Sequence, residues 1–323
     1  MTDIETCQYM EVNVEKKSYK NFMSGLNTTL FMAHGIEPAF VWAMDVKRAA
    51  QANRVLAEMP TVDMAPVLAC IRRLYRLVLK NGTDALGTNK NKRFLRARQI
   101  IIFIVRLDTG ARSADMEGLP VGKFRTRPAG VALHKAEVIN LRFRRPKEER
   151  LRMAGAHWSG EVGIAQNPAC TDPHYWETSF ARWWPIYIKL RRAVKNPGFQ
   201  SVDEHGYTVS AAHAFTGTDG SAIGTDRMSN TIKALLTECK VMGQHTAFTA
   251  KHLRHNFATV CLRLPAKEEL MRKEQVVATL RHSGLGSLKH YLATDVHPDV
   301  RARWEATAGS KKRLDGRAQW LRC

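Results

Sequence analysis

Near the C-terminal end of the chain, a tyrosine follows two basic motifs at short range. Tyr291 stands nine residues (291 − 282) after His282, and the run Lys251-His252-Leu253-Arg254-His255 precedes both. A free phenol has a pKa of about 10 and is a poor nucleophile at neutral pH. It can still attack a phosphodiester without a metal ion when fixed cations stabilise the charge that develops on the phosphate. The spacing therefore indicates covalent cleavage and rejoining of a DNA strand.

Such a site needs several cationic groups besides the tyrosine. Arginine suits the phosphate because its planar guanidinium donates two hydrogen bonds and stays charged, and a lysine or histidine can protonate the departing 5′ oxygen. The chain offers Arg112 in a turn after an apolar helix, with Asp115 one helical turn later to hold the next segment. It also offers Arg254 at the start of another apolar helix. We therefore expect these two arginines to meet His282 and Tyr291.

Three motifs of the chain resemble those of the tyrosine recombinases, the phage integrase family. The family's first motif, T-G-x-R-x-x-E/D, matches Thr109-Gly110-Ala111-Arg112-Ser113-Ala114-Asp115. Its second, H-x-L-R-H-x-F-A-T, matches residues 251–259 at every position but the first. Its third, L-G-H-S followed by Y-L, is similar to Leu280-Arg281-His282-Ser283 and Tyr291-Leu292, at the interval that the family pattern expects. The resemblance spans roughly residues 91–292.

The resemblance implies a mechanism and a set of partners. Arg112 and Arg254 would clamp the scissile phosphate, and His282 would hydrogen-bond one of its non-bridging oxygens. Tyr291 would form a 3′-phosphotyrosine bond, which the 5′-hydroxyl of a second strand could reverse. Neither a metal ion nor a nucleotide cofactor is expected. The implied function is site-specific strand exchange on double-stranded DNA by a homotetramer, for integration, excision or transposition of a mobile element.

The family places its catalytic lysine in a β-hairpin between the two arginine motifs. In this chain the predicted strand Val138–Phe143 is followed by Arg144-Arg145-Pro146-Lys147-Glu148, which fits that position. Lys147 is therefore the expected donor of the proton to the 5′ oxygen. Arg145 and Lys135 are its rivals.

One position departs from the family pattern and leaves other functions open. Lys251 stands where the family has its first histidine, and His252 is displaced by one residue. A lysine there also resembles the poxvirus-type IB topoisomerases and the hairpin-forming telomere resolvases, which use the same chemistry. In each case Lys251 would add charge or help proton transfer. A non-catalytic DNA-binding protein on the same fold is a third alternative, although binding alone would not need Tyr291.

The charge of the chain favours a polyanionic partner. Its 323 residues include 50 Lys and Arg against 30 Asp and Glu, which leaves a net charge of +20. A basic surface gains affinity for DNA or RNA by displacing counterions. At any single position, a solvated basic face is the alternative. The arginines predicted to contact phosphates are Arg72, Arg73, Arg76, Arg144, Arg145, Arg191 and Arg192.

The apolar pattern predicts a mainly α-helical fold with a small antiparallel β-sheet. The length suits two domains. We expect a helical domain over residues 1–88, similar in kind to the core-binding domain of the recombinases, and a catalytic domain with a basic C-terminal tail over residues 89–323. A polar, glycine-containing stretch at residues 80–92 is the predicted linker. Short alternating stretches within residues 121–165 predict the sheet.

Several helices are expected to position the site. A buried helix is predicted at Arg93–Leu107, a second helix at Tyr175–Val194 and another around Phe257. An apolar stripe from Met228 to Met242 predicts a further helix, which Gly243 would end. The helix that precedes them shows one apolar face, formed by Val67, Ile71, Leu74 and Val78.

The cysteines and the apolar runs narrow the class of protein further. The six cysteines form no CxxC pair, so neither a zinc site nor a disulfide framework is predicted. Cys70, Cys239 and Cys261 lie on apolar helical faces and are expected to be core thiols in a reducing compartment. The first residues lack a secretory signal pattern, and the longest apolar run, Ile100–Val105, is too short to cross a bilayer. We expect an intracellular protein that works where the DNA is, in a nucleus or a nucleoid.

Overall fold

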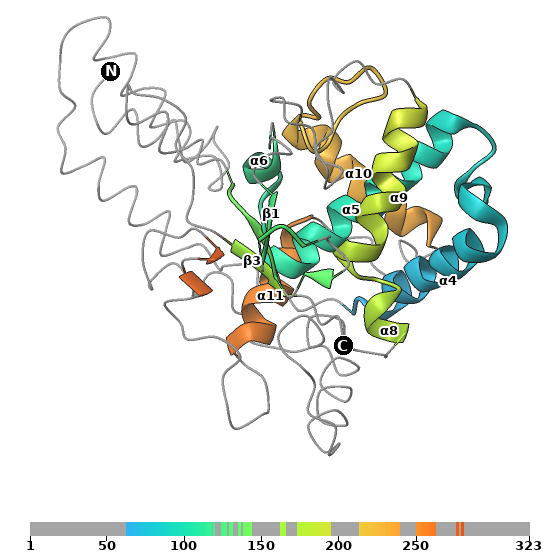
Figure 1. Cartoon of the computed structure of the whole chain (residues 1–323). Helices are drawn as coiled ribbons and strands as arrows, with labels where there is room; N and C mark the ends of the chain where they lie inside the picture. Colours follow the sequence, from blue (N-terminus) through green and yellow to red (C-terminus); the bar gives the residue numbers. More distant parts are fainter. Residues whose placement is uncertain are drawn as a thin grey trace, which may run out of the picture. The chain divides into compact units, whose positions relative to one another are not determined.

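The chain divides into two compact units, Met1–Glu58 and Met59–Cys323. The computed structural model, drawn in Figure 1, describes residues 63–117, 119, 124–127, 129–131, 135–136, 138–143, 162–165, 173–194, 213–239, 250–262, 276–277 and 279–280. All of these belong to the second unit. The first unit, which holds most of the domain predicted at residues 1–88, lies outside the described residues.

A long helix, α5 (Lys90–Thr109), forms the centre of the second unit (Figure 1). The Asn89 side chain caps its start by accepting a hydrogen bond from the backbone N–H of Lys92 at 2.9 Å. The residues from Ile100 to Thr109 are all buried, which confirms the predicted buried helix. Three later helices pack against it: α9 (Phe180–Ala193), α10 (Thr225–Glu238) and α11 (Ala250–Leu262).

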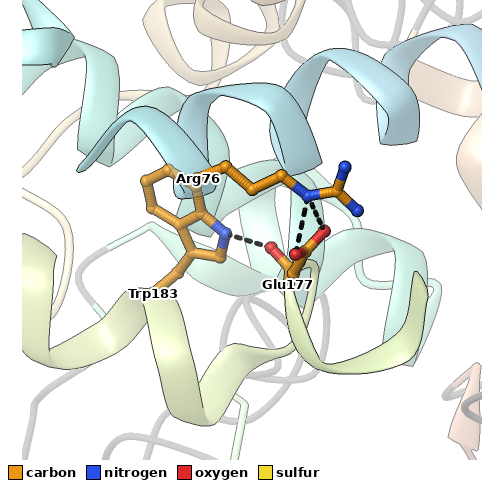
Figure 2. A network of polar contacts seen from close by, with 3 residues as sticks. All are labelled: Arg76, Glu177 and Trp183. Carbon is orange, nitrogen blue, oxygen red and sulfur yellow. Dashed lines mark hydrogen bonds and ion pairs between the residues drawn. The ribbon is translucent and has the colours of Figure 1, made fainter. Parts of the chain in front are cut away.

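The helix before α5, α4 (Ala65–Asn81), shares the core of the later helices. The Tyr75 ring meets that of Trp183 at a centroid distance of 5.8 Å. Figure 2 shows Arg76 Nε donating to both carboxylate oxygens of Glu177, at 2.8 and 3.0 Å, while Trp183 Nε1 donates to the Glu177 carbonyl at 2.8 Å. Helix α4 therefore belongs to the compact unit Met59–Cys323, while the domain boundary expected at 88/89 stays a prediction. The predicted apolar face is confirmed by the burial of Val67, Ile71, Leu74 and Val78.

The stretch predicted as a linker at residues 80–92 is a compact connection. It contains a short 3-10 helix, η2 (Gly82–Leu86), and then enters α5. The Leu86 side chain is only 3% exposed, and Arg93 forms an ion pair with Asp84 at 2.5 Å. The linker prediction is wrong because one buried apolar side chain and local polar bonds fold this polar sequence tightly between two helices.

The described strands form one antiparallel sheet in the order β1 (Phe124–Arg127), β2 (Val138–Leu141) and β3 (Val162–Ala165). Ile139 pairs with Ile164 across β2 and β3, and both side chains are fully buried. Apolar residues alternate along the strands because successive side chains point to opposite faces. The small antiparallel sheet predicted within residues 121–165 is confirmed.

A single helix was predicted at Tyr175–Val194, but the structure has two. The short α8 (Pro173–Trp176) ends in a turn in which the Ser179 N–H donates to the Trp176 carbonyl at 3.0 Å. Helix α9 then begins at Phe180. The prediction is wrong at residues 177–179, because the Glu177 carbonyl in this turn accepts the bond from the Trp183 indole.

The described part of the second unit is thus mainly helical with a small antiparallel sheet, as the sequence predicts. On α10 the predicted apolar residues Met228, Ile232 and Leu235 are buried. The predicted end of that stripe, at Met242 and Gly243, lies outside the described residues. Among the helices that the structure describes, none combines the length and the apolar character that a bilayer span requires.

We expect Trp183→Phe to lower the free energy of unfolding by about 2 kcal/mol, because it removes the donor to the Glu177 carbonyl and leaves space beside Tyr75. Arg76→Gln is the comparison variant. It breaks an ion pair in which the Arg76 side chain is 60% exposed, so water already screens the charge and the change should be much smaller. Urea denaturation followed by circular dichroism measures both. Equal losses would contradict the assignment of the indole as the stabilising group.

Candidate functional site

The turn that carries Arg112 begins where α5 ends. Gly110 closes the helix in the left-handed conformation, with φ 60°, and its N–H donates to the Arg106 carbonyl at 2.8 Å. After Ala111, the half-buried Arg112 precedes the short α6 (Ser113–Met116). The Arg112 N–H donates to Asp115 Oδ2 at 2.8 Å, and the Asp115 N–H donates to the Arg112 carbonyl at 3.1 Å. The predicted role of Asp115 in holding this segment is confirmed.

Polar bonds from two other helices fix α6. From α5, Arg106 NH1 donates to Ser113 Oγ at 2.6 Å, and that hydroxyl also contacts Ser229 Oγ of α10 at 3.0 Å. Burial lowers the pKa of Arg106 to about 10, although the negative charge of Asp115 opposes this shift. The side chain therefore keeps its charge at neutral pH. These bonds place the Arg112 turn between α5 and α10.

These bonds to α6 were not predicted from the sequence. Arg106 carried a visible signal, because it is a cation inside the apolar run of a buried helix, and such a residue needs hydrogen-bond acceptors nearby. The sequence contains no such signal for Ser229, because the pattern of α10 predicts only which of its apolar residues are buried. A further cross-helix bond, from Thr225 Oγ1 to Glu117 Oε2 at 2.7 Å, was equally invisible.

Arg254 joins the first and second motifs to the start of the third. It lies on α11 and is 3% exposed. Its NH1 group donates to the Gly110 carbonyl at 2.8 Å, and its NH2 group donates to the Leu280 carbonyl. These bonds use two of the five N–H donors of a guanidinium. The Arg254 side chain therefore contacts two other segments that are distant in sequence. One contains Gly110, two residues before Arg112, and the other contains Leu280, two residues before His282.

The approach of these segments requires a glycine at position 110. A Cβ atom built there would lie 2.7 Å from Leu280 Cδ2 and 3.1 Å from the Phe257 ring. Those distances are shorter than carbon atoms in contact adopt. The residue also has a positive φ, which side chains disfavour. Gly110 thus allows α5, α11 and residue 280 to pack together.

The other predicted catalytic residues lie outside the described part of the chain. Lys251 is on α11, but its side chain is not described, and Lys147, His282 and Tyr291 fall outside the described residues altogether. Of the two rivals of Lys147, Lys135 is exposed, whereas Arg145 lies outside the described residues, as does Arg144. The structure therefore describes the surroundings of the two arginines but not those of the proposed nucleophile.

The tyrosines that the structure does describe are all packed into the core. Tyr75 lies against Trp183, and Tyr175 is 2% exposed. Tyr187 is fully buried, its hydroxyl donates to the Ala214 carbonyl at 2.9 Å, and burial raises its pKa. A buried phenol that is already bonded to a carbonyl cannot reach a DNA backbone. None of these three side chains competes with Tyr291 for the role of nucleophile.

The predicted phosphate-contacting arginines divide into an exposed and a buried set. Arg73, Arg76 and Arg192 are exposed, and Arg72 is half-buried. Arg191 is fully buried, and its NH1 group donates to the His213 carbonyl at 2.6 Å. The Arg191 guanidinium therefore lies in the interior, and its predicted phosphate contact stays a prediction. A pocket of about 460 Å³ along α4 is lined by Ala69, Arg72, Arg73, Arg76, Leu77 and Lys80.

Buried side chains from α5 and α9 hold the segment that leads into α10. Arg98 NH1 donates to the Thr216 carbonyl at 2.7 Å, and Tyr187 and Arg191 bond the carbonyls of the residues just before it. Burial lowers the pKa of Arg98 and of Arg191. Residues 213–216 lead into α10, which carries Ser229. The bonds to their carbonyls therefore help to position Ser229 against Ser113, next to Arg112.

The sequence matches no family model and no curated protein sequence. Solved structures similar to the computed one include XerA recombinase, at 15% identity over 89% of this chain and 82% of that chain, with a TM-score of 0.42. The Tn1549 transposon integrase in complex with transposon right-end DNA is 15% identical over 95% of this chain and 84% of that chain, with a TM-score of 0.46. XerH site-specific recombinase bound to difH substrate is 14% identical over 72% of this chain and 50% of that chain, with a TM-score of 0.45.

We expect Gly110→Ala to lower the free energy of unfolding by about 3 kcal/mol, because the methyl group overlaps Leu280 and Phe257 and the backbone is strained. Gly130→Ala is the matched control. Gly130 also has a positive φ, of 81°, but a Cβ atom there would meet nothing within 4 Å. It should therefore cost only the backbone strain, about 1 kcal/mol. Denaturation curves that show equal losses would contradict the close packing around Gly110.

Proposed function

We propose that this protein is a site-specific tyrosine recombinase that cleaves and rejoins DNA through a 3′-phosphotyrosine intermediate. The observation that carries the proposal is the pair of bonds from Arg254 to the Gly110 and Leu280 carbonyls. Residues that resemble the family's three motifs are far apart in sequence, and this guanidinium contacts all three segments.

In the proposed reaction, Arg112 and Arg254 neutralise the non-bridging oxygens of the scissile phosphate, and His282 donates a hydrogen bond to one of them. Charge stabilisation of this kind matters most where negative charge grows during the attack. The Tyr291 hydroxyl gives up its proton to water, and its oxygen forms a new bond to phosphorus while the bond to the 5′ oxygen breaks. The rigid support of α6 suits this role, because small displacements of a charged group cost a large part of the rate.

A cation must give a proton to the departing 5′ oxygen. Lys147 is the proposed donor, with Arg145 and Lys135 as alternatives, and Lys251 would add charge or assist the proton transfer. A lysine is suited to this task because its pKa falls readily near other cations or on burial, which brings it closer to neutral pH.

The partner in this proposal is double-stranded DNA, bound by a homotetramer during strand exchange. The net charge of +20 supports a polyanionic partner. On the described surface, the basic side of α4 with Arg72, Arg73 and Arg76 offers phosphate contacts, as does Arg192 on α9. Integration, excision or transposition of a mobile element would be the outcome.

Lys251 favours a second candidate, because a lysine at this motif position also suits a type IB topoisomerase or a hairpin telomere resolvase. The two candidates differ in their need for a specific site and for several protomers. Rapid relaxation of a supercoiled plasmid without a cognate site, by a monomer, would support the second candidate. Strand exchange that requires one DNA sequence and an assembled tetramer would support the first.

The direct test of the proposal is a trapping experiment with nicked DNA. Cleavage near a nick releases a short strand and leaves the protein bound covalently. We expect the wild-type chain to form this adduct and Tyr291→Phe to form none while binding DNA equally well, because only the nucleophilic hydroxyl is lost. Denaturing gels measure the adduct, and gel shifts measure binding.

The control is Tyr207→Phe, which removes a hydroxyl from another tyrosine outside the described residues. It should leave adduct formation unchanged. An adduct that survives in Tyr291→Phe would reject Tyr291 as the nucleophile. No adduct in the wild-type chain, on any substrate that it binds, would favour the non-catalytic DNA-binding protein.

Arg112→Lys tests the phosphate clamp. Lysine keeps the charge but loses the planar fork, so we expect the single-turnover cleavage rate to fall by about 100-fold or more. The exposed Arg182 on α9, which stacks on the Trp176 ring at 4.7 Å, provides a control with the same exchange. Arg182→Lys should cleave at the wild-type rate. Similar rates for the two variants would reject the clamp.

A further inference from the structure

The outer side of α4 carries a row of positive charge. Four cations, Arg72, Arg73, Arg76 and Lys80, line the pocket of about 460 Å³ along this helix. They recur at spacings of three and four residues, which places them on one helical face, opposite the apolar face that packs into the core. No carboxylate belongs to the part of the pocket wall that the structure describes. The pocket therefore suits an anion.

One of these cations, Arg76, is held by a carboxylate from another part of the chain. Its Nε–H is shared between the two carboxylate oxygens of Glu177, at 2.8 and 3.0 Å. The Glu177 side chain is 13% exposed, against 60% for that of Arg76, so the carboxylate is the more buried partner and the guanidinium faces solvent. Figure 2 shows the two terminal nitrogens of Arg76 on the side of the guanidinium away from the Trp183 indole. Their N–H groups are available to a ligand in the pocket.

The carboxylate is itself fixed, because Glu177 lies in the turn after α8. The Glu177 carbonyl accepts the hydrogen bond from Trp183 Nε1 at 2.8 Å, and the Ser179 N–H donates to the Trp176 carbonyl at 3.0 Å. A guanidinium that is bonded to an anchored carboxylate loses much of its freedom before any ligand arrives. It can then bind a phosphate with a smaller loss of conformational entropy.

We propose that Arg76 binds a phosphate of the DNA backbone away from the cleavage point, and that Glu177 is the positioning residue that orients it. This inference rests on the proposed function and deepens it, because it assigns a separate anchoring site for the duplex. The site is formed by α4 and the turn after α8, whereas Arg112 and Arg254 are held by other elements. It governs how tightly DNA binds and leaves the cleavage rate of bound DNA unchanged.

The length of the row fits a duplex. Arg72 and Lys80 are eight positions apart (80 − 72), which corresponds to about 12 Å along the helix axis. Duplex DNA carries one negative charge per about 1.7 Å of its own axis, so several phosphates lie within reach of the four cations. A free polyphosphate offers the same chemistry over a shorter distance. The net charge of +20 favours the longer polyanion.

Glu177 has two opposing effects on the binding of a phosphate by Arg76. Its negative charge repels the phosphate, and at a separation of about 7 Å in water this weakens binding by about threefold at most, before screening by salt. Its bond to Arg76 orders a long side chain in advance, which is worth about tenfold or more in affinity. The second effect is the larger. Removal of Glu177 should therefore weaken DNA binding, although the chain becomes more positive.

The test measures duplex binding by the full chain, using fluorescence anisotropy at several salt concentrations. We expect Glu177→Ala to weaken the affinity by about threefold. Glu177→Gln keeps an acceptor for Arg76 Nε and loses the charge, so it should bind at least as tightly as the wild type. Arg76→Gln should weaken binding by about fivefold and reduce the slope of log K against log salt concentration by about 1.

The double variant separates orientation from a general defect of the fold. In the Arg76→Gln background, Glu177→Ala should no longer weaken binding, because no guanidinium is left to orient and only the repulsion is removed. A weakening that persists in this background would show a structural defect and overturn the inference. Tighter binding by Glu177→Ala alone would also overturn it, because the charge of Glu177 would then be its main effect.

Lys233→Gln is the control, at an exposed lysine of α10 that does not line the pocket. It should keep the wild-type affinity and salt slope, and an equal loss there would show a diffuse basic surface instead of a site. The same variants are also titrated with inorganic tripolyphosphate. A loss confined to this ligand would assign the pocket to a small polyphosphate and overturn the DNA contact.

Trapping with nicked DNA at saturating concentration distinguishes this inference from the proposed function. All of these variants should form the covalent adduct at the wild-type rate. Unchanged affinity in every variant, with normal adduct formation, would reject the site on α4 and leave the proposed function standing. Affinities that follow the expectations above, without any adduct, would support the site and reject the cleavage chemistry.

Discussion

The positive charge of Arg254 is the feature on which the arrangement of the site depends. A buried guanidinium is costly unless acceptors replace the water that it loses. Here two backbone carbonyls do so, those of Gly110 and Leu280. The first lies just beyond the C-terminal end of α5, where the aligned peptide dipoles place partial negative charge, so the helix itself favours the cation. Because both acceptors belong to the main chain, the contact constrains backbone positions directly. A displacement of α11 would disturb the end of α5 and, through it, the turn that carries Arg112.

The sequence was sufficient for features whose cause is local. The spacing of apolar residues predicted α4 and α5, the alternation within residues 121–165 predicted the sheet, and the turn residues predicted how Asp115 holds the Arg112 segment. It failed where the deciding partner lies elsewhere in the chain. The Glu177 carbonyl breaks the predicted helix between α8 and α9 by accepting a bond from Trp183. The carbonyls that draw Arg191 inward belong to a segment about twenty residues later, so Arg191 and its exposed neighbour Arg192 look alike in the sequence.

Buried arginines recur in this unit as backbone anchors. Arg98 and Arg191 donate to carbonyls of residues 213–216, and Arg106 donates to a serine hydroxyl beneath Arg112. Burial lowers the pKa of each of these guanidinium groups. An arginine tolerates such a shift and remains protonated, because its ordinary pKa is so far above neutrality. A lysine in the same surroundings would lose its proton more readily and would have fewer donors for the carbonyls. The interior thus uses the same residue type as the predicted DNA surface, for a different purpose.

The packing of α4 on Trp183 and Glu177 has a practical consequence for dissecting the protein. A fragment cloned from residue 89 onward, the start of the predicted catalytic domain, would begin almost at α5 and would lack α4 altogether. The indole of Trp183 and the adjoining apolar side chains would then face water, and such an uncovered patch promotes aggregation. A fragment that starts at Met59 retains α4, which covers these side chains. Whether a shorter fragment is soluble therefore depends on whether it contains α4, a helix that was predicted to belong to the neighbouring domain.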